Sequence, residues 1–211
     1  MIIAVDGPAA AGKGTLARQL ARHFGFAYLD TGSLYRAVAL AVLHAGGAPD
    51  DPVAGVAAAQ ALDVAAIDQV AIRSPEIGQA ASQVAALLPV RQAILDFQRD
   101  FAAHPPGNAQ GAVLDGRDIG TVVCPKADIK FYVTASPEIR AHRRFLELQA
   151  AGNSVSEADV LAEVKGRDAR DAERAHSPLK PAADAHLLDT SNLSIETAFD
   201  AALSVIDQAK S

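Results

Sequence analysis

A glycine-rich segment with one lysine, near the start of the chain, constrains the fold more than any other feature. The apolar run from Ile2 to Val5 has the pattern of a buried strand and stops at Asp6-Gly7. The next segment matches a phosphate-binding loop and consists of Gly7, Pro8, Ala9, Ala10, Ala11, Gly12, Lys13, Gly14 and Thr15. Its glycines let backbone N–H groups point at phosphate oxygens, and Lys13 adds a mobile charge. The alternative is a Gly/Ala-rich turn with no ligand, but the strand–loop–helix context and the lysine favour a phosphate site.

The residue after the lysine departs from the usual phosphate-loop motif. A Ser or Thr normally stands there to bind Mg²⁺, but Gly14 takes this place and Thr15 follows. We therefore expect no direct protein ligand to a metal ion. Thr15 and Asp115, a carboxylate after a later apolar run, are expected to act on the metal through water.

The hydrophobic pattern predicts an α/β fold with a parallel sheet. Further strand-like runs are Phe26 to Leu29, Ala112 to Leu114, Ile129 to Val133 and His186 to Leu188, and helix-period segments separate most of them. Leu16, Leu20 and Phe24 recur every four residues and predict a helix that Gly25 ends. Val90, Ile94, Phe97 and Phe101 predict a second helix that packs on the core.

Two segments interrupt this alternation. Residues 47–82 open with GGAPDDP, and the partial period-2 alternation of LDVAAI and QVAIRS predicts a small hairpin within an insertion. Residues 147–177 are polar and charge-dense and are interpreted as a mobile helical flap with a large solvent-facing side.

Composition limits the classes of function. The 211 residues suit a single compact domain, and half of them are apolar. The single cysteine, Cys124, excludes an intramolecular disulfide, and the absence of a leader-like start favours a cytoplasmic location. No apolar run is long enough for a membrane helix, and the net charge of -6 argues against nucleic acid and membrane partners. Clustered arginines still suit small phosphorylated molecules.

Polar side chains follow two of the expected strands. Asp30, Thr31 and Arg36 come after the second strand, where ligands of such sheets bind. Arg117 and Asp118 follow Asp115 after the third, where an arginine can grip a phosphate and an aspartate can accept from the amine of a base. The alternatives are a helix cap for Asp30, a solvated charge for Arg36, and a turn with an internal Arg–Asp pair for the later segment.

Arginines recur at helical spacing near the mobile flap. Arg140, Arg143 and Arg144 share one expected helix face, and Arg167, Asp171 and Arg174 share another. Such faces can close on a polyphosphate, where fixed cations meet the charge on the moving phosphoryl group and water is excluded. The alternative is an ordinary solvated helix face with surface ion pairs.

These motifs together resemble the bacterial cytidylate kinases, members of the nucleoside monophosphate kinase family of phosphate-loop proteins. The resemblance runs almost end to end, and its GKGT sequence is also found in adenylate kinases. The segments that carry it are GPAAAGKGT at 7–15, DTGSLYR at 30–36, AASQVAALLPVR at 80–91, LDGRDIGTVV at 114–123, RAHRRFLELQ at 140–149 and GRDARDAERAHSPL at 166–179.

The resemblance implies a fold and a reaction. The expected fold is a P-loop NTPase-type sheet of five parallel strands with helices on both faces, a nucleoside-monophosphate-binding insertion at 47–82 and a helical lid at 147–177. The implied reaction transfers a phosphoryl group from ATP, with Mg²⁺, to CMP or dCMP. Lys13, Arg117, Arg143 and Arg174 are the expected catalytic cations.

The resemblance also implies roles for residues that bind the acceptor nucleotide. Thr31 and Arg36, behind Asp30, match positions at the monophosphate, and Arg117 matches a phosphate-gripping arginine. Residues expected to read the cytosine ring are Ser82, Arg91 and Asp118. Residues expected on the ribose side and at the phosphates are Arg167, Asp171 and Arg174.

Other functions remain open at this stage. One is a related kinase with a different acceptor, such as AMP or UMP, since the donor machinery is shared. Another is a non-catalytic nucleotide-binding module, against which the arginine clusters and paired acids argue. No coiled-coil pattern is present, so we expect a monomer.

Overall fold

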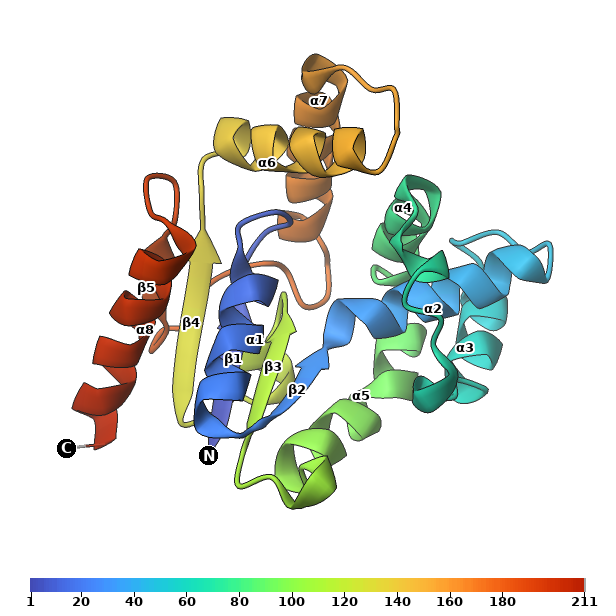
Figure 1. Ribbon diagram of the computed structural model, residues 1–211. Helices are drawn as coiled ribbons and strands as arrows, with labels where there is room; N and C mark the ends of the chain where they lie inside the picture. Colours follow the sequence, from blue (N-terminus) through green and yellow to red (C-terminus); the bar gives the residue numbers. More distant parts are fainter. Residues whose placement is uncertain (211) are drawn as a thin grey trace. The chain divides into compact units, whose positions relative to one another are not determined.

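The computed structural model describes residues 1–210 and divides into two compact units (Figure 1). The sheet unit comprises Met1–Leu29 and the chain from Pro105 onward, and the helical unit comprises Asp30–His104. The strands are β1 (Ile2–Asp6), β2 (Ala27–Asp30), β3 (Ala112–Gly116), β4 (Ile129–Thr134) and β5 (His186–Asp189). The main helices are α1 (Lys13–Phe24), α2 (Thr31–His44), α3 (Pro52–Gln60), α4 (Pro75–Val84), α5 (Leu88–Ala103), α6 (Pro137–Ala150), α7 (Glu157–Ala172) and α8 (Ile195–Lys210).

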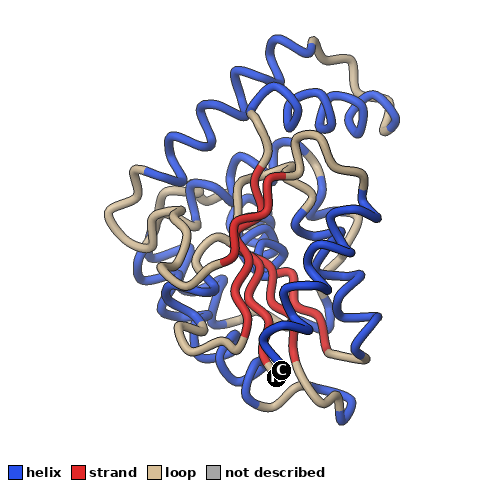
Figure 2. The backbone as a smooth tube through the Cα atoms, turned by 90° about the vertical axis from the view of Figure 1, so that its left-hand side faces the viewer, coloured by secondary structure: helices blue, strands red, loops and turns tan. Residues whose placement is uncertain are grey.

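The strands form one parallel sheet, as the sequence predicts, and their order in it is β2-β3-β1-β4-β5 (Figure 2). β1 lies at the centre and pairs with β3 from Ile2 opposite Ala112 to Asp6 opposite Gly116. Its residues Ile3, Ala4 and Val5 are fully buried, which explains the unbroken apolar run. α1 and α8 pack against each other and bury one hydrophobic cluster with the strands. The carboxyl end of β1 is thereby fixed in the middle of the sheet.

The predicted first helix is confirmed as α1. Leu16 and Leu20 are buried in the sheet unit's core, and Gly25 ends the helix with a φ of 65°, a left-handed conformation that glycine adopts readily. The helix therefore begins at the phosphate-loop lysine, as the motif requires.

The hairpin predicted within residues 47–82 is absent from the helical unit, so this prediction was wrong. The stretch 62–67 forms the short 3₁₀ turn η1 (Val64–Ala66), and the stretch 69–74 forms η2 (Ala71–Arg73). The side chain of Asp63 accepts from Ala65 N, and that of Asp68 accepts from Val70 N and Ala71 N. Local aspartate turns thus take the backbone N–H groups that a strand ladder would need.

Two helices of this unit, α2 and α5, match the apolar pattern in the sequence. Leu34, Val38 and Val42 of α2 are buried in the core, and Val90 and Ile94 of α5 join them. The aromatic end of the predicted stripe on α5 is less covered, since Phe97 is 39% exposed. The predicted insertion, 47–82, falls inside the helical unit.

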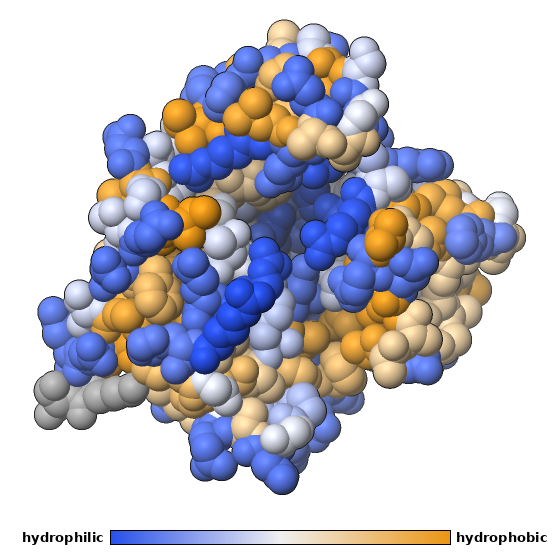
Figure 3. Space-filling view, in the orientation of Figure 1, coloured by the Kyte–Doolittle hydropathy of each residue, from blue (hydrophilic) through white to orange (hydrophobic). Residues whose placement is uncertain are grey.

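α6 and α7 pack on each other and share a small apolar cluster, and the predicted flap, residues 147–177, contains all of α7 but only the end of α6. Their outer surface carries hydrophilic residues interspersed with hydrophobic ones (Figure 3). α7 ends at Ala172, so Arg174 lies beyond the helix and not on its face as predicted. The reason is that the chain turns back: Leu179 N donates to the carbonyl of Asp171. Within residues 1–210 no helix is long and apolar enough to cross a membrane.

Candidate active site

Two glycines shape the loop between β1 and α1. Gly7 has a φ of 150°, and a Cβ there would collide with the carbonyl oxygen of Val133 in β4. Gly12 has a φ of 84° and caps α1, accepting from Thr15 N and Leu16 N. Only glycine suits both positions. The loop therefore lies tightly against the sheet, with the N-terminus of a helix behind it, which is an anion-binding arrangement.

Side chains from outside the loop hold two of its carbonyl groups. Thr190, just after β5, donates from Oγ1 to the carbonyl of Ala11 at 2.9 Å. Arg140 of α6 donates from Nη1 to the carbonyl of Ala9 at 3.4 Å. Since these bonds fix the peptide planes of the loop, they favour one arrangement of its N–H groups.

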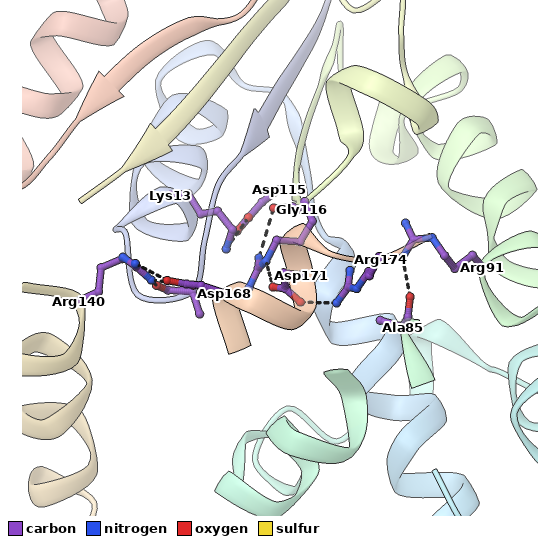
Figure 4. Close-up of polar contacts among 11 residues, drawn as sticks. Lys13, Ala85, Arg91, Asp115, Gly116, Arg140, Asp168, Asp171 and Arg174 are labelled. Atoms are coloured by element: carbon purple, nitrogen blue, oxygen red, sulfur yellow. Dashed lines mark hydrogen bonds and ion pairs between the residues drawn. The ribbon is translucent and has the colours of Figure 1, made fainter. Parts of the chain in front are cut away.

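Lys13 lies beside the carboxylate that the sequence analysis associates with the metal. Its Nζ is 3.2 Å from Oδ1 of Asp115, which is almost fully buried at the end of β3 (Figure 4). The Tyr28 hydroxyl donates to Oδ2 at 3.3 Å. A Cβ on Gly14 would lie 2.9 Å from the same Oδ2. The missing side chain at residue 14 thus makes room for the carboxylate.

Asp171 gathers two of the predicted cations. Arg117 donates from Nε to Oδ2 of Asp171 at 3.0 Å, and Arg174 donates to Oδ1 (Figure 4). The Asp171 side chain is 1% exposed. Burial alone would raise the pKa of Asp171, but the charges of Arg117, Arg174 and Arg167 outweigh burial and hold the pKa below its ordinary value.

The arginines predicted to share one face of α6 have separate partners. Arg140 is buried and makes a bidentate ion pair with Asp168 of α7, at 3.0 and 2.5 Å, while its Nε donates to the carbonyl of Ala135. Arg143 donates to the hydroxyl and the carbonyl of Thr190, at 3.1 and 2.8 Å. Arg144 pairs with the exposed Glu147 on its own helix. The three are therefore not gathered on one ligand face, because each finds a nearby acceptor.

A buried carboxylate at the end of β1 was not among the predicted site residues. Asp6 accepts from Ile119 N and Gly120 N, both at 2.7 Å. These residues open η4 (Ile119–Val123), a π-helical turn directly after Asp118. Burial raises the pKa of Asp6 to about 6, its bonds to the Gly120 and Ile119 N–H groups oppose the rise, and the charges of Asp118 and Asp115 add to it.

Asp30, Thr31 and Arg36, which were predicted to lie at the acceptor, belong to the helical unit. Asp30 caps α2 by accepting from Ser33 N, as one alternative foresaw, and Thr31 is buried in the first turn. Arg36 donates to the carbonyl of Ile72 at 3.0 Å and fills the space beside Gly78, where a Cβ would lie 3.3 Å from its guanidinium.

Ser82 and Arg91 lie in the same unit. Ser82 is 3% exposed, and its Oγ has no hydrogen-bond partner within residues 1–210. Arg91 is 7% exposed, donates to the carbonyl of Ala85 at 3.0 Å and lies over the ring of Tyr35, 5.3 Å from its centroid. A buried hydroxyl lacking a partner is costly, and a ligand group can satisfy it.

Sequence reasoning missed the site residues Asp6, Asp168 and Thr190. Asp6 was taken only as the end of a strand, although an acid directly before a phosphate loop, at the centre of a parallel sheet, is expected to be buried. Asp168 and Thr190 bind arginines that are 28 and 47 residues away in the sequence, and no local pattern signals such pairs. Thr190 does follow a predicted strand, which is a usable signal.

The parallel sheet, the phosphate loop and the paired lysine and arginines define a phosphate-loop kinase. The model of the cytidylate kinase family matches residues 3–208, and the chain belongs to this family.

Individual relatives agree with this assignment. A cytidylate kinase of Rhodospirillum rubrum is 58% identical over 206 residues, covering 98% of this chain and 97% of the relative. One of Afipia carboxidovorans is 55% identical over 210 residues, covering 100% and 99%. Among solved structures, an uncharacterized protein from Eubacterium ventriosum has a TM-score of 0.55 at 16% identity and covers 98% of each chain, which shows the shared fold.

Proposed function

We propose that the protein transfers the terminal phosphoryl group of ATP to CMP or dCMP, yielding ADP and CDP or dCDP. The observation that carries this proposal is the match to the cytidylate kinase family over residues 3–208. The geometry adds support, because the phosphate loop and Lys13 can bind the phosphates of ATP and Asp115 lies beside Lys13, where it can contact a metal ion through water.

The phosphate loop is the proposed binding site for the ATP phosphates. Its backbone N–H groups and the start of α1 favour negative charge, and Lys13 can turn from Asp115 to the outer phosphates. The residues present fit Mg²⁺, an ion that keeps most of its water and needs one or two carboxylates besides phosphate. Asp115 and Thr15 are the proposed contacts through water, and the ion would supply charge neutralisation at the phosphates.

The helical unit contributes proposed contacts to the acceptor. Thr31 and Arg36, next to the cap residue Asp30, are proposed to bind the acceptor phosphate. Ser82 and Arg91 are proposed to read the cytosine ring, which presents an amino donor beside two acceptors. Support comes from the Ser82 hydroxyl, buried without a protein partner, and from the buried, fixed guanidinium of Arg91.

The sheet unit contributes a second set of residues. Asp118 is proposed to accept from the cytosine amine, and Arg167 and Asp171 are proposed to bind the ribose side. Arg117 and Arg174, which Asp171 holds in place, are proposed to meet the charge on the transferred group. Arg143 remains a predicted catalytic cation, although here it binds Thr190 and contributes to the loop support.

The test is ADP release from ATP and Mg²⁺ with CMP, dCMP, UMP, AMP and GMP as acceptors. We expect a strong preference for CMP and dCMP that Lys13→Ala abolishes. Preference for another acceptor would overturn the base-reading roles, and nucleotide binding without acceptor-dependent turnover would indicate a binding module. This assay does not test three further proposals: that the protein is a monomer, that it is cytoplasmic and that residues 147–177 move as a lid. Light scattering measures the oligomeric state.

A further inference from the structure

Asp6 joins the end of one strand to the loop that leaves the next. Its carboxylate accepts from two successive backbone N–H groups, one oxygen binding Ile119 N and the other Gly120 N. The residue is 4% exposed. Both bonds are short at 2.7 Å, and a charged acceptor strengthens them.

These two N–H groups belong to a compact turn that includes Asp118. The carbonyl of Asp118 accepts from Val122 N at 2.8 Å and from Val123 N at 3.1 Å. In the sheet, Asp6 pairs in register with Gly116, two residues before Asp118. Asp6 thus holds the chain on both sides of Asp118. Before Asp118 it pairs with Gly116 in the strand ladder, and after Asp118 its carboxylate binds the N–H groups of Ile119 and Gly120.

Holding the turn with a charge is expensive. Asp6 lies near Asp115 and Asp118, both also buried, so an ionised carboxylate is opposed by burial and by like charge. An ordinary turn does not need such a group. The arrangement is explained if the position of the turn matters for what Asp118 binds.

We propose that Asp6 is a positioning residue for Asp118 and thereby a determinant of cytosine specificity. Asp6 touches no substrate in this proposal, which rests on the proposed function and on the role of Asp118 in it. Its carboxylate holds the η4 turn in the place where Asp118 accepts from the cytosine amine.

The test is steady-state kinetics of Asp6→Asn at neutral pH. Asparagine keeps the size of the side chain but offers one acceptor oxygen, so one of the two N–H groups loses its partner. We expect the KM for CMP to rise roughly tenfold and the preference for CMP over UMP to fall, while the KM for ATP changes less than about twofold. A purely structural role would lower stability without changing acceptor preference.

Asp128→Asn is the matched control. Asp128 Oδ2 accepts from Ile2 N at 2.6 Å, so it is a carboxylate that binds a backbone N–H at the opposite end of β1. We expect this variant to keep both KM values and the acceptor preference.

A double-mutant cycle with Asp118→Ala tests whether Asp6 acts through Asp118. Adding Asp6→Asn to Asp118→Ala is expected to change the KM for CMP no further. Full additivity of the two effects overturns the proposal, as does an Asp6→Asn enzyme with unchanged CMP and UMP kinetics.

Gly120→Ala approaches the same contact from the other side and replaces Asp6→Asn if that variant does not fold. A Cβ on Gly120 would lie 3.3 Å from Oδ2 of Asp6 and 3.1 Å from Cδ of Lys130. We expect a smaller change in the same direction, about twofold to threefold in the KM for CMP. Unchanged acceptor kinetics in this variant overturn the proposal. A wild-type protein that does not phosphorylate CMP refutes the proposed function instead, so the two failures are distinguishable.

Discussion

Three cations of the sheet unit, Lys13, Arg117 and Arg174, pair with buried carboxylates, whereas two cations of the helical unit, Arg36 and Arg91, donate to backbone carbonyl groups. Lys13 pairs with Asp115, and Arg117 pairs with Asp171. Arg36 and Arg91, in contrast, donate to the carbonyls of Ile72 and Ala85. A phosphate that approaches the first group competes with an anion already in place, while the guanidinium groups of the second are oriented by carbonyl groups of the backbone. We infer that the cations of the sheet unit serve the transfer step and that the cations of the helical unit serve acceptor recognition, together with Asp118 of the sheet unit.

The largest effect is expected at Lys13. Lys13→Ala removes the mobile charge of the phosphate loop, and we expect kcat to fall about 1,000-fold, because preorganised cations supply most of the stabilisation in phosphoryl transfer. The ADP-release assay with CMP measures it. Lys165→Ala, which breaks an exposed pair with Glu138, is the control and is expected to keep its activity. A residual kcat within tenfold of wild type would contradict a role of the Lys13 charge in the transfer step.

Asp171→Asn tests whether cations held by a carboxylate serve the transfer step, because Asp171 holds both Arg117 and Arg174. We expect a loss of about 3 kcal/mol in the free energy of unfolding, since Arg117 and Arg174 lose a buried counter-charge, and kcat roughly 100-fold lower. Because the pKa of Asp171 is lowered, the ionised carboxylate contributes this stability at pH values above the ordinary pKa of an aspartate. The contribution is lost as the pH falls through the lowered pKa of Asp171.

Urea unfolding of Asp171→Asn beside Glu147→Gln measures this difference. Glu147→Gln removes the exposed partner of Arg144, and we expect a change of less than about 1 kcal/mol. Equal stability losses in the two variants would mean that burial of the carboxylate contributes nothing.

In the helical unit we expect a selective effect on the acceptor. Arg91→Lys keeps the charge but loses the planar contact over Tyr35, so the KM for CMP should rise about tenfold with the KM for ATP unchanged. Initial rates over a matrix of ATP and CMP concentrations separate the two. Arg99→Lys, an exposed position on the same helix, is the control. A parallel rise in the KM for ATP would remove the contrast between the units.

The smallest effect concerns the pH dependence of stability at Asp6. Its pKa is raised to about 6, so protonation favours the folded state and this contribution is lost as the pH rises through 6. Relative to Asp6→Asn, the wild type is therefore expected to gain about 1 kcal/mol of unfolding free energy between pH 7 and pH 5. Urea midpoints of both proteins across this range measure the difference. A constant difference would show that Asp6 titrates outside this window.

Local patterns predicted the parts of the fold that depend on local physics. The phosphate loop, the five strands and the apolar stripes of α1 and α2 followed from periodicity and glycine placement. The hairpin prediction failed because Asp63 and Asp68 use their side chains to close short turns, a signal stronger than weak alternation. Arg174 was placed on a helix because its spacing fits one, although α7 ends at Ala172 and the chain then turns back toward Asp171.

The partners within the candidate site could not be predicted from the sequence. Asp115 and Lys13 meet because β3 lies next to β1, which spacing along the chain does not reveal. Ser82 and Arg91 entered only through resemblance, since no rule of periodicity shows what a buried hydroxyl or guanidinium faces. Burial at the centre of the sheet raises the pKa of Asp6, and the charges of Asp118 and Asp115, which parallel pairing brings near it, add to the rise.

Arg140 links the phosphate loop to α7. It binds the carbonyl of Ala9 in the phosphate loop and the carboxylate of Asp168 in α7 through one guanidinium group. The phosphate loop and α7 therefore have a partner in common, so that losing the carboxylate of Asp168 would leave this buried guanidinium with the carbonyl groups of Ala9 and Ala135 alone among these contacts.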